Sequence, residues 1–366
     1  MNRPGARVVF LALDIWSRLG GMQAFNRRVT ASLADSAAAA GGPQPRIHIL
    51  RDINKDIPTD VRVLARGFGA DRVGFAWASL RAAGHADMLL LGHINLLPLG
   101  WLAKAFRPRL RLMLFVHGIE VWDDPAYRRQ RFYEPLLLRA VDRVVSVSRT
   151  TARIMADRFK VPASKFAILP NAIDGPVSVK SAWPQKPVFL CVTRMEAHDH
   201  GKNIDKLLQA FARLPDDLEA VLEIVGDGVM RPPLQALSET LAGSGRVTFL
   251  GRVSDGERDE AYRRASTFVL PSAKEGFGIV YLEAWKYGLP VICGHGGGAQ
   301  EIVTDGEDGL VVDPDDIADL ASAMYRLATN PDGAAAMGRK GAQKLTSAYL
   351  DDSFRKKFAQ LLIGAL

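Results

Sequence analysis

The sequence predicts an α/β protein with two doubly wound domains, each a parallel sheet covered by helices on both faces. Three observations predict this class. Short apolar runs of strand length alternate with amphipathic stretches of helical length, such as 203–214. The strand-like runs are continuously apolar, as expected for strands that are buried on both faces. They form two series, separated by a break at 171–187 that contains three prolines.

The first series defines an N-terminal domain, which we expect to span residues 1–175. Its opening run has only about eight apolar residues and no cleavage-like site, so it is expected to be a strand and not a signal peptide. The later runs are bounded by turn residues and separated by helical patterns. In chain order the predicted strands are 7–13, 46–50, 61–65, 87–92, 110–116 and 142–148.

The second series defines a C-terminal domain, expected at residues 176–351. The same alternation of apolar runs and helical patterns continues there, which predicts a second parallel sheet. A final helix, at about 352–366, follows this series, and the pattern does not decide whether it packs back on the first domain. The predicted strands are 187–193, 218–226, 246–251, 266–271, 289–293 and 309–313.

Composition excludes several classes of protein. The chain has 366 residues, of which 48% are hydrophobic and 24% charged, as in soluble globular proteins. It contains no apolar run of 18 residues, so no transmembrane helix is expected. The two cysteines, Cys191 and Cys293, lie in strand-like runs. This position argues against a disulfide framework and a cysteine zinc site, and it favours the cytoplasm.

Charge is distributed unevenly between the two halves. Residues 1–175 hold 26 Lys and Arg against 14 Asp and Glu, whereas residues 176–366 hold 21 against 26. In the segments 101–112 and 127–139, basic residues alternate with Trp, Phe and Tyr. Such segments suit an anionic membrane surface, an acceptor phosphate or a solvated basic face. No nucleic-acid motif accompanies them, so nucleic acid is not expected as a partner.

Ligands of doubly wound sheets bind beyond the carboxyl ends of the strands, so residues that directly follow strands are informative. Gly20 and Gly21 precede a helix, where backbone N–H groups can approach an anion, although a plain tight turn explains them equally well. His93 and His117 end two neighbouring strands. An isolated histidine usually has a structural role, but two histidines at equivalent positions make it more favourable that one of their side chains faces the ligand cleft.

The second domain begins with a strand that leads into two cations. Arg194 follows the strand, and Lys202 stands near the start of the next helix. An Arg fork and a Lys point charge beside a helix N-terminus are suited to a diphosphate, although a surface loop could carry both. Gly226 lies in a glycine turn after the next strand. Val253 follows another strand, where its backbone can meet a base edge.

The most informative segment is 274–290, KEGFGIVYLEAWKYGLP. Glu275 lies in the loop between a strand and a helix, and Glu283 lies inside that helix, eight residues later. A carboxylate beside a helix N-terminus can accept hydrogen bonds from sugar hydroxyls, and one further along can bind both hydroxyls of a ribose. The alternative is a capping acid and an exposed helical acid. A glycine cluster at 294–298 favours the ligand-binding interpretation, because its N–H groups can form an anion nest.

These motifs together resemble the retaining nucleotide-sugar glycosyltransferases of family 4, which have the two-domain GT-B fold. The E-x7-E motif of that family matches Glu275 and Glu283. The diglycine, the HG-x-E segment at 117–120, the Arg and Lys at 194 and 202, and the segment at 297–312 follow in the family's order. The segment at 194–205 is similar to bacterial exopolysaccharide and lipid-linked oligosaccharide α-mannosyltransferases. Three features depart from the pattern: Asn203 replaces a glycine, Gly201 replaces an aromatic residue, and Met22 and Gln23 stand where many members have an acid.

The resemblance implies two Rossmann-like domains facing a central cleft, with the donor held by the C-terminal domain. It implies retaining transfer of a hexose, with mannose favoured, to a glycan or polyprenyl-diphosphate-linked acceptor in bacterial surface polysaccharide synthesis. No metal and no cofactor beside the nucleotide sugar are expected. The implied catalytic residues are His117, Arg194, Lys202 and Glu275. The implied donor-binding residues are Gly20, Gly21, Arg194, Lys202, Gly226, Val253, Glu275, Gly276, Phe277, Gly278, Ile279 and Glu283. The implied acceptor-binding residues are His93, Glu120 and Arg149.

Three alternatives remain at this point. A nucleotide-sugar 2-epimerase has the same architecture but needs no acceptor. A transferase that uses UDP-glucose or UDP-GlcNAc fits the same motifs. A catalytically idle partner protein is disfavoured, because a binding module has no need of both cations and both carboxylates. The expected location is the cytoplasm, with peripheral contact at the inner membrane face as one option.

Overall fold

A computed structural model of the chain describes residues 5–18, 20–122, 125, 127–179, 183–242 and 245–365. The chain divides into two compact units. The N-terminal unit comprises Met1–Ala172 together with Asp351–Leu366, and the C-terminal unit comprises Ile173–Leu350. The final helix therefore belongs to the N-terminal unit.

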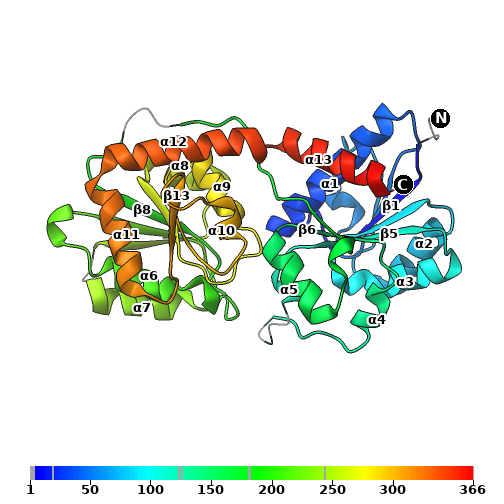
Figure 1. The fold of residues 1–366 in the computed structure, drawn as a ribbon, viewed down its shortest axis with the longest axis horizontal. Helices are drawn as coiled ribbons and strands as arrows, with labels where there is room; N and C mark the ends of the chain where they lie inside the picture. The colour runs from blue at the N-terminus through cyan, green and yellow to red at the C-terminus, as the bar shows by residue number, and fades with distance from the viewer. Residues whose placement is uncertain are drawn as a thin grey trace. The chain divides into compact units, whose positions relative to one another are not determined.

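A seven-stranded parallel sheet forms the centre of the N-terminal unit (Figure 1). The strand order is β3-β2-β1-β4-β5-β6-β7, so the order reverses beside β1. The strands are β1 (Val8–Ala12), β2 (Arg46–Ile49), β3 (Leu64–Gly67), β4 (Met88–Leu91), β5 (Arg111–Val116), β6 (Arg143–Ser146) and β7 (Phe166–Ile168). Strands β1, β4 and β5 are almost entirely buried, which explains their unbroken apolar sequences.

Helices cover both faces of this sheet. Helices α1 (Gly21–Ala39) and α13 (Asp351–Ala365) pack together on one face, and α2 (Arg72–Ala83), α3 (Leu97–Phe106), α4 (Glu134–Leu138) and α5 (Arg149–Phe159) lie on the other (Figure 1). Local sequence defines where these helices begin. The side chains of Asp71 and Ser148 accept hydrogen bonds from the first turns of α2 and α5.

An aromatic cluster explains why the last helix packs on the N-terminal unit. Phe354 and Phe358 of α13 are fully buried, and Phe354 lies 5.3 Å from the ring of Phe25 on α1. Phe115 of β5 extends the cluster through both Phe25 and Phe358. Large aromatic side chains contribute more buried area than other residues, so α13 supplies a substantial share of this core.

A six-stranded parallel sheet forms the C-terminal unit, in the order β10-β9-β8-β11-β12-β13. Its strands are β8 (Val188–Val192), β9 (Val221–Val225), β10 (Val247–Gly251), β11 (Thr267–Leu270), β12 (Val291–Gly294) and β13 (Gly309–Val312). Its helices are α6 (Ile204–Phe211), α7 (Arg231–Ala242), α8 (Asp255–Arg264), α9 (Ile279–Lys286), α10 (Ala299–Ile302), α11 (Ile317–Thr329) and α12 (Pro331–Ala348). The order reverses beside β8, so the loops after β8 and β11 adjoin the switch point.

The predicted fold class is confirmed: both units are parallel sheets covered by helices. Each predicted strand has a counterpart, although the strand predicted at 61–65 lies at 64–67. Strand β7 was not predicted, because it has only three residues, all half-buried, at the edge of the sheet. Among the described residues, no helix combines the length and apolarity needed to cross a bilayer.

Candidate functional site

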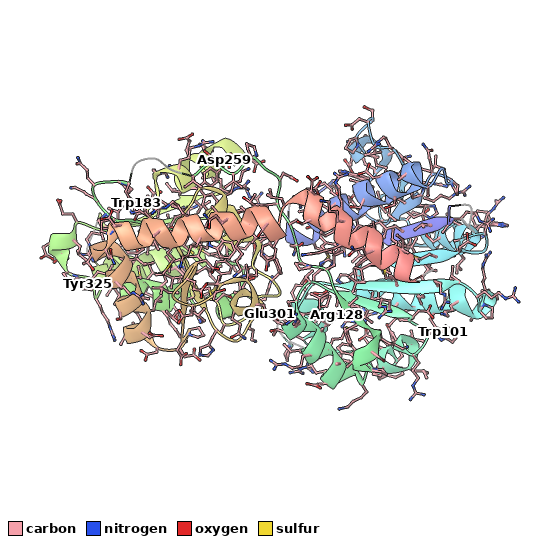
Figure 2. All side chains as sticks on the ribbon, turned by 45° about the horizontal axis from the view of Figure 1, so that its top comes forward. Trp101, Arg128, Trp183, Asp259, Glu301 and Tyr325 are labelled. Atoms are coloured by element: carbon pink, nitrogen blue, oxygen red, sulfur yellow. The ribbon has the colours of Figure 1, made fainter. Side chains whose placement is uncertain are left out.

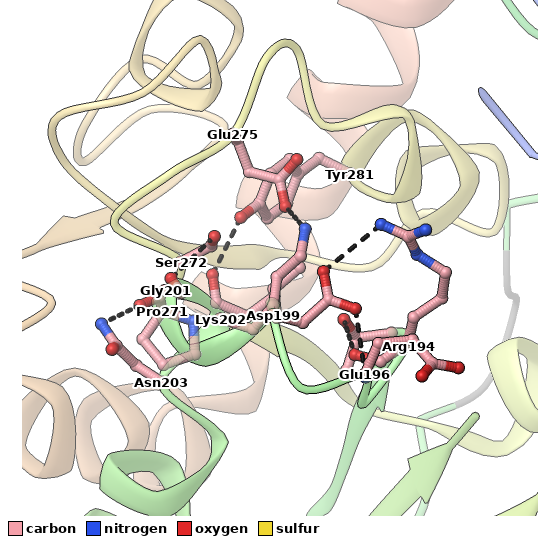
Figure 3. A network of polar contacts seen from close by, with 12 residues as sticks. Arg194, Glu196, Asp199, Gly201, Lys202, Asn203, Pro271, Ser272, Glu275 and Tyr281 are labelled. Carbon is pink, nitrogen blue, oxygen red and sulfur yellow. Dashed lines mark hydrogen bonds and ion pairs between the residues drawn. The ribbon is translucent and has the colours of Figure 1, made fainter. Parts of the chain in front are cut away.

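The loop after β8 holds the first predicted cation. Arg194 is largely exposed, and its Nη2 donates to Oδ1 of Asp199 over 3.3 Å. The side chain of Asp199 is nearly buried, and its other oxygen accepts from the backbone N–H of Glu196 at 3.2 Å (Figure 3). Asp199 therefore orients the guanidinium while leaving most of it accessible. Asp199 was not among the site residues predicted from the sequence.

The second predicted cation contacts a predicted carboxylate. Nζ of Lys202 donates to Oε1 of Glu275, and both side chains are mostly buried (Figure 3). Lys202 comes from the loop that leads to α6, whereas Glu275 comes from the loop between β11 and α9. Neighbouring parallel strands thus bring together two residues that lie 73 positions apart.

Asn203 explains one departure from the family pattern. Its backbone is left-handed, with φ of 56°, at the start of α6. Glycine adopts this conformation without cost, and asparagine is among the few other residues that tolerate it. Its side-chain amide also donates to the carbonyls of Pro271 and Pro314, each over 3.0 Å. Asn203 therefore keeps the turn that a glycine would make and anchors it to two neighbouring loops.

Gly201, the second departure, lies where its own loop meets the loop after β11. Its carbonyl accepts from Oγ of Ser272 at 3.1 Å and from the backbone N–H of Ala273 at 2.8 Å. A Cβ at this position would lie 3.3 Å from the flexible side chain of Lys274. The two loops that carry Lys202 and Glu275 are therefore fixed to each other by backbone contacts as well as by the ion pair.

The glycine cluster after β12 packs directly against the Glu275 loop. The N–H of Gly298 donates to the carbonyl of Glu275 over 2.6 Å. A Cβ on Gly297 would lie 2.7 Å from the nitrogen of Glu275, and one on Gly298 would lie 2.3 Å from the carbonyl oxygen of Gly276. Only glycine permits so close an approach of two backbones. The cluster therefore has a structural role in shaping this loop, which the sequence prediction of an anion nest did not include.

Helix α9 begins directly after the Glu275 loop. Gly278 is its N-cap, with φ of 93°, a conformation that favours glycine, and Ile279 is its first residue. Phe277 is buried, with its ring 6.0 Å from that of Tyr349. The segment 276–279 is thus held rigidly at a helix N-terminus, where backbone N–H groups favour anions and hydroxyl oxygens.

The second acid of the motif, Glu283, is bound to a residue that the sequence analysis missed. Oη of Tyr262, on α8, donates to Oε2 of Glu283 over 2.9 Å. Burial raises the pKa of Glu283, while Arg258 and the Tyr262 hydroxyl oppose that rise. The ring of Tyr262 is stacked on that of Tyr287, with 5.4 Å between centroids. The hydroxyl holds one carboxylate oxygen in place and leaves Oε1 for another partner.

Two more predicted donor contacts follow strands of this unit. Gly226 has φ of 132°, and a Cβ there would lie 1.7 Å from the carbonyl oxygen of Thr193. Only glycine fits at position 226, because the backbone of the 193–196 loop lies too close for a side chain. Val253 is half-buried in the turn between β10 and α8. The structure places both positions at carboxyl ends of strands, and their contact with a base stays a prediction.

In the N-terminal unit, a buried carboxylate shapes the segment before the diglycine. Asp52 accepts from the backbone N–H groups of Ile15 and Trp16, at 3.1 and 2.7 Å, and from Oγ of Ser17. Gly20 is the N-cap of α1 and Gly21 its first residue. Asp52 was not found by the sequence analysis, because nothing in the local pattern links it to a loop 36 residues earlier.

The diglycine is covered by the side chain of Gln23, where many family members have an acid. A Cβ on Gly20 would lie 2.4 Å from Oε1 of Gln23, whereas Gly21 has open space. Nε2 of Gln23 donates to the carboxylate of Asp14, which also forms an ion pair with Arg51 at 2.8 Å. An acid is therefore present at this position through Asp14, although it comes from the preceding strand end.

His93 and His117 follow the adjacent strands β4 and β5. Nδ1 of His93 accepts from the N–H of Asn95 at 3.0 Å, and burial lowers the pKa of His93 to about 3. Burial also lowers the pKa of His117 to about 4. The His117 ring lies edge-on to Phe25, with 4.9 Å between centroids. Both imidazoles are therefore neutral at physiological pH.

Glu120 is buried and binds its own loop. Its carboxylate accepts from the N–H of His117, and burial raises its pKa. Arg128, which is labelled in Figure 2, was not assigned from the sequence; it donates to the carbonyl of Glu120 at 3.1 Å and pairs with Glu134. Arg149 is the exposed first residue of α5. Acceptor contacts of Glu120 and Arg149 stay predictions, and the structure gives Glu120 a clear role in holding the His117 turn.

No group of three or more His, Cys, Asp or Glu side chains able to hold a metal ion occurs in the described part of the chain. The groups that the structure does assemble are two cations, two carboxylates and a glycine-shaped helix N-terminus, all in the C-terminal unit. Such a set can bind a diphosphate and several hydroxyl groups at once.

Solved structures share this architecture over almost the whole chain. The Anabaena protein HepE, in complex with UDP and glucose, superposes with a TM-score of 0.79 and covers 98% of this chain and 100% of its own, at 17% identity. Sucrose-phosphate synthase from Thermosynechococcus elongatus gives a TM-score of 0.79 at 20% identity, with 98% of each chain covered. The fold is therefore GT-B, the two-domain class of glycosyltransferases.

Sequence comparisons identify the family. The model described as "Glycosyl transferases group 1" matches residues 178–344, and that described as "Glycosyltransferase Family 4" matches 28–175. A GDP-mannose-dependent alpha-(1-6)-phosphatidylinositol monomannoside mannosyltransferase of Mycobacterium tuberculosis is 30% identical over 277 residues, covering 69% of this chain and 70% of its own. The counterpart from Mycolicibacterium smegmatis is 30% identical over 289 residues, with 73% of each chain covered. The chain belongs to the group 1, family 4 glycosyltransferases and is a glycosyltransferase enzyme.

Proposed function

We propose that this glycosyltransferase moves a hexose from a nucleotide diphosphate sugar to a glycan or polyprenyl-diphosphate-linked acceptor, with retention at the anomeric carbon, in bacterial surface polysaccharide synthesis. The observation that carries the proposal is the ion pair between Lys202 and Glu275 in the loop before α9, with Arg194 held by Asp199 in the same loop as Lys202 (Figure 3). The reaction needs positive charge for the departing diphosphate and acceptors for the sugar hydroxyls, and these residues supply both.

Arg194 and Lys202 stabilise the leaving diphosphate in this proposal. The exposed guanidinium of Arg194 can bind two oxygens in a fork, because Asp199 engages one of its nitrogens and most of the group is accessible. Lys202 adds a point charge from a site that is largely shielded from water. Charges act more strongly in such surroundings than in water. The proposal assigns this stabilisation to the protein and requires no metal ion.

Glu275 has two roles in the proposed cycle. Its carboxylate holds Lys202 in position and accepts hydrogen bonds from hydroxyl groups of the donor sugar, while the N–H groups of 276–278 donate to oxygens of that sugar. A diphosphate that binds Lys202 competes with Glu275 for the ammonium. Such competition loosens the ion pair and makes the carboxylate oxygens available to hydroxyl groups. Donor binding and the availability of Glu275 are thereby coupled.

Glu283 binds the ribose in this proposal. Tyr262 occupies Oε2, so the remaining oxygen and the second lone pair of Oε2 are available to the ribose hydroxyls. Gly226 and Val253 line the path toward the base. On the acceptor side, His93, Glu120 and Arg149 are proposed to contact the acceptor, with neutral His117 near the sugar and the N–H groups of Gly20 and Gly21 near the diphosphate.

GDP-mannose is the favoured donor. The relatives from Mycobacterium tuberculosis and Mycolicibacterium smegmatis are named as GDP-mannose-dependent mannosyltransferases. A relative from Rhizobium meliloti, 32% identical over 161 residues, is named as a lipopolysaccharide core biosynthesis glycosyltransferase, which supports a surface-glycan acceptor. UDP-glucose and UDP-GlcNAc are the competing donors. Peripheral contact with an anionic membrane would bring the enzyme to a lipid-linked acceptor.

A thermal-shift panel of GDP, UDP and ADP, each free and as its sugar conjugates, tests the donor. A ligand at 100 times its dissociation constant adds ~2.7 kcal/mol to the free energy of unfolding, so the true donor separates from the others. We expect the largest shift with GDP-mannose. Transfer is then measured as nucleotide release with and without acceptor. A panel in which no sugar nucleotide shifts the melting temperature would contradict the proposal, and acceptor-independent epimerisation of the donor would replace transfer by isomerisation.

A further inference from the structure

The face of the N-terminal unit formed by α2 and α3 presents large apolar side chains to solvent. On α2, Val73 and Trp77 are 81% and 64% exposed and lie one helical turn apart, on the same side. On α3, Trp101 and Phe106 are 41% and 78% exposed. The two helices pack side by side on one face of the sheet, so their outer surfaces adjoin (Figures 1 and 2). We call this surface the α2–α3 face.

Exposure on this scale is unusual for tryptophan and phenylalanine. Burying such a side chain is worth roughly 1.5–3 kcal/mol, and folding of the unit leaves four large apolar groups unburied on neighbouring helices. The inner positions of α2, among them Phe75 and Ala82, are buried in the core. The outer apolar positions therefore do not serve the core, which indicates a partner.

Basic residues surround these apolar groups. Between Arg72 and Arg111 the sequence holds six Lys and Arg and a single acid, Asp87. Arg81 lies on the ring of Trp77, with its guanidinium carbon 5.5 Å from the centroid. Asp87 pairs with Arg7 and Arg107, and Asp142 pairs with Lys104 and Arg111, so the net positive charge of the face comes from Arg72, Arg81 and Arg109. Within the described part of the chain, Arg72 and Arg109 have no ion-pair partner.

Basic and aromatic residues also alternate at 127–133, directly before α4. Phe132 is 95% exposed, and it stands between Arg131 and Tyr133. Helices α3 and α4 are in contact, so this segment borders the α2–α3 face. Residues 127–133 contain no acidic residue, so this described part of the chain extends the surface with basic and aromatic side chains.

We propose that the α2–α3 face binds an anionic lipid bilayer, with Trp77, Trp101 and Phe106 at the level of the headgroups. The charge pattern selects this partner. The exposed Arg72, Arg81 and Arg109 stand beside the aromatic side chains and are all positive, which matches an anionic surface. Interfacial helices place Trp and Phe on one side and Lys or Arg beside them, and each basic residue near an anionic surface adds to the attraction. The inference deepens the proposed function, since it brings the enzyme to the plane of a lipid-linked acceptor.

Flotation of the full chain with vesicles tests the proposal without any donor or acceptor. We expect flotation with phosphatidylcholine vesicles that contain phosphatidylglycerol, little flotation with phosphatidylcholine alone, and release by salt. The variant Trp77→Ala/Phe106→Ala should lose most of the bound fraction. The variant Arg72→Glu/Arg109→Glu should weaken binding by about fivefold or more for each arginine.

Two control variants change residues that are not part of the face. Ile363→Ala removes an apolar side chain of α13 that is 75% exposed on the opposite side of the sheet, and Arg326→Glu reverses an exposed charge on α11. Both should float like the wild type. Melting temperatures close to that of the wild type show that the variants fold.

Three results would overturn the proposal. The first is flotation that does not depend on phosphatidylglycerol or on salt. The others are flotation of the Trp77/Phe106 and Arg72/Arg109 variants at the wild-type level, and dimerisation through this face in place of vesicle binding. The failure of this inference is separable from that of the proposed function. Trp77 and Phe106 lie outside the donor site, so Trp77→Ala/Phe106→Ala should keep its thermal shift with the sugar nucleotide. A chain that floats but binds no sugar nucleotide would instead retain the membrane face and refute the proposed donor site.

Discussion

Replacing Lys202 by alanine perturbs two properties at once, the stability of the C-terminal unit and the proposed stabilisation of the leaving diphosphate. Lys202 and Glu275 are 18% and 12% exposed at their side chains. Exposed ion pairs contribute ~0–1 kcal/mol. Removal of one partner from a fully buried pair costs ~3–5 kcal/mol, because the other charge stays uncompensated. Burial between these limits gives an expected loss of about 1–3 kcal/mol in the free energy of unfolding.

The effect on catalysis should be larger than this loss of stability implies. Removing one preorganised group that stabilises developing charge costs ~2.7–4 kcal/mol of transition-state stabilisation. We therefore expect turnover at saturating donor to fall by more than about 100-fold. Measurements at a temperature well below the unfolding transition keep the enzyme folded, so that the two effects are separate.

Two further variants identify the cause. Lys206→Ala removes a lysine of α6 whose partner, Asp315, is 77% exposed, and it should leave turnover and stability near wild-type values. Lys202→Met/Glu275→Gln removes both charges, so it should recover stability relative to Lys202→Ala but not turnover. The assays are nucleotide release at saturating donor and urea-induced unfolding.

A Lys202→Ala enzyme that keeps turnover within threefold of the wild type, at saturating donor, would refute the assignment of this lysine to the leaving group. Recovery of turnover in the double variant would refute it as well. In that case the structural role of the ion pair would explain the whole effect.

Three other predictions follow from single contacts. Tyr262→Phe removes the hydroxyl that donates to Glu283, so calorimetry should show binding of the free nucleotide weakened about tenfold, or about 1.4 kcal/mol, while turnover at saturating donor is retained. The control is Tyr325→Phe on α11. An unchanged affinity in Tyr262→Phe would remove Tyr262 from the ribose site. Asn203→Ala should destabilise the protein by about 1–2 kcal/mol more than Asn203→Gly, because both variants lose two hydrogen bonds but only alanine is strained by the left-handed backbone. Equal unfolding curves for the two variants would contradict this role of the backbone conformation. The pKa of His117 is lowered from 6.5 to about 4 in the folded protein, so its contribution to stability is present above pH 6.5 and is lost as the pH falls toward 4. This loss should reach about 3 kcal/mol and be absent in His117→Asn, and identical pH dependence of unfolding in both proteins would contradict the burial argument.

Much of the fold could be predicted from local sequence. Continuously apolar strands such as β4 and β5 show that both faces of each sheet are covered, and the helical stretches between them require parallel crossovers. Strand β7 escaped prediction because three half-buried residues at a sheet edge give no periodic signal. The location of α13 also escaped prediction. Its amphipathic pattern shows that one face of the helix must be buried but does not indicate which domain covers it. In the structure, Phe25 and Phe115 of the N-terminal unit cover that face.

The candidate site could be predicted only in part. Arg194, Lys202, Glu275 and Glu283 stand out because charged residues that directly follow strands, or lie beside glycines, have a recognisable spacing. Their partners gave no such signal. Tyr262 is one aromatic residue among many, and its hydrogen bond to Glu283 joins two helices, α8 and α9, that follow different strands. Asp52 lies in a loop far from the segment that it binds.

The sequence by itself determined the elements and their chemistry: two parallel sheets, glycines where backbones turn, and charged groups at the carboxyl ends of strands. These features follow from interactions over a few residues, which a linear sequence displays directly. The tertiary structure decided the pairings, namely Lys202 with Glu275, Arg194 with Asp199, and Glu283 with Tyr262. Strand order brings these residues together across long separations, and no local pattern encodes the distance between two side chains on different strands.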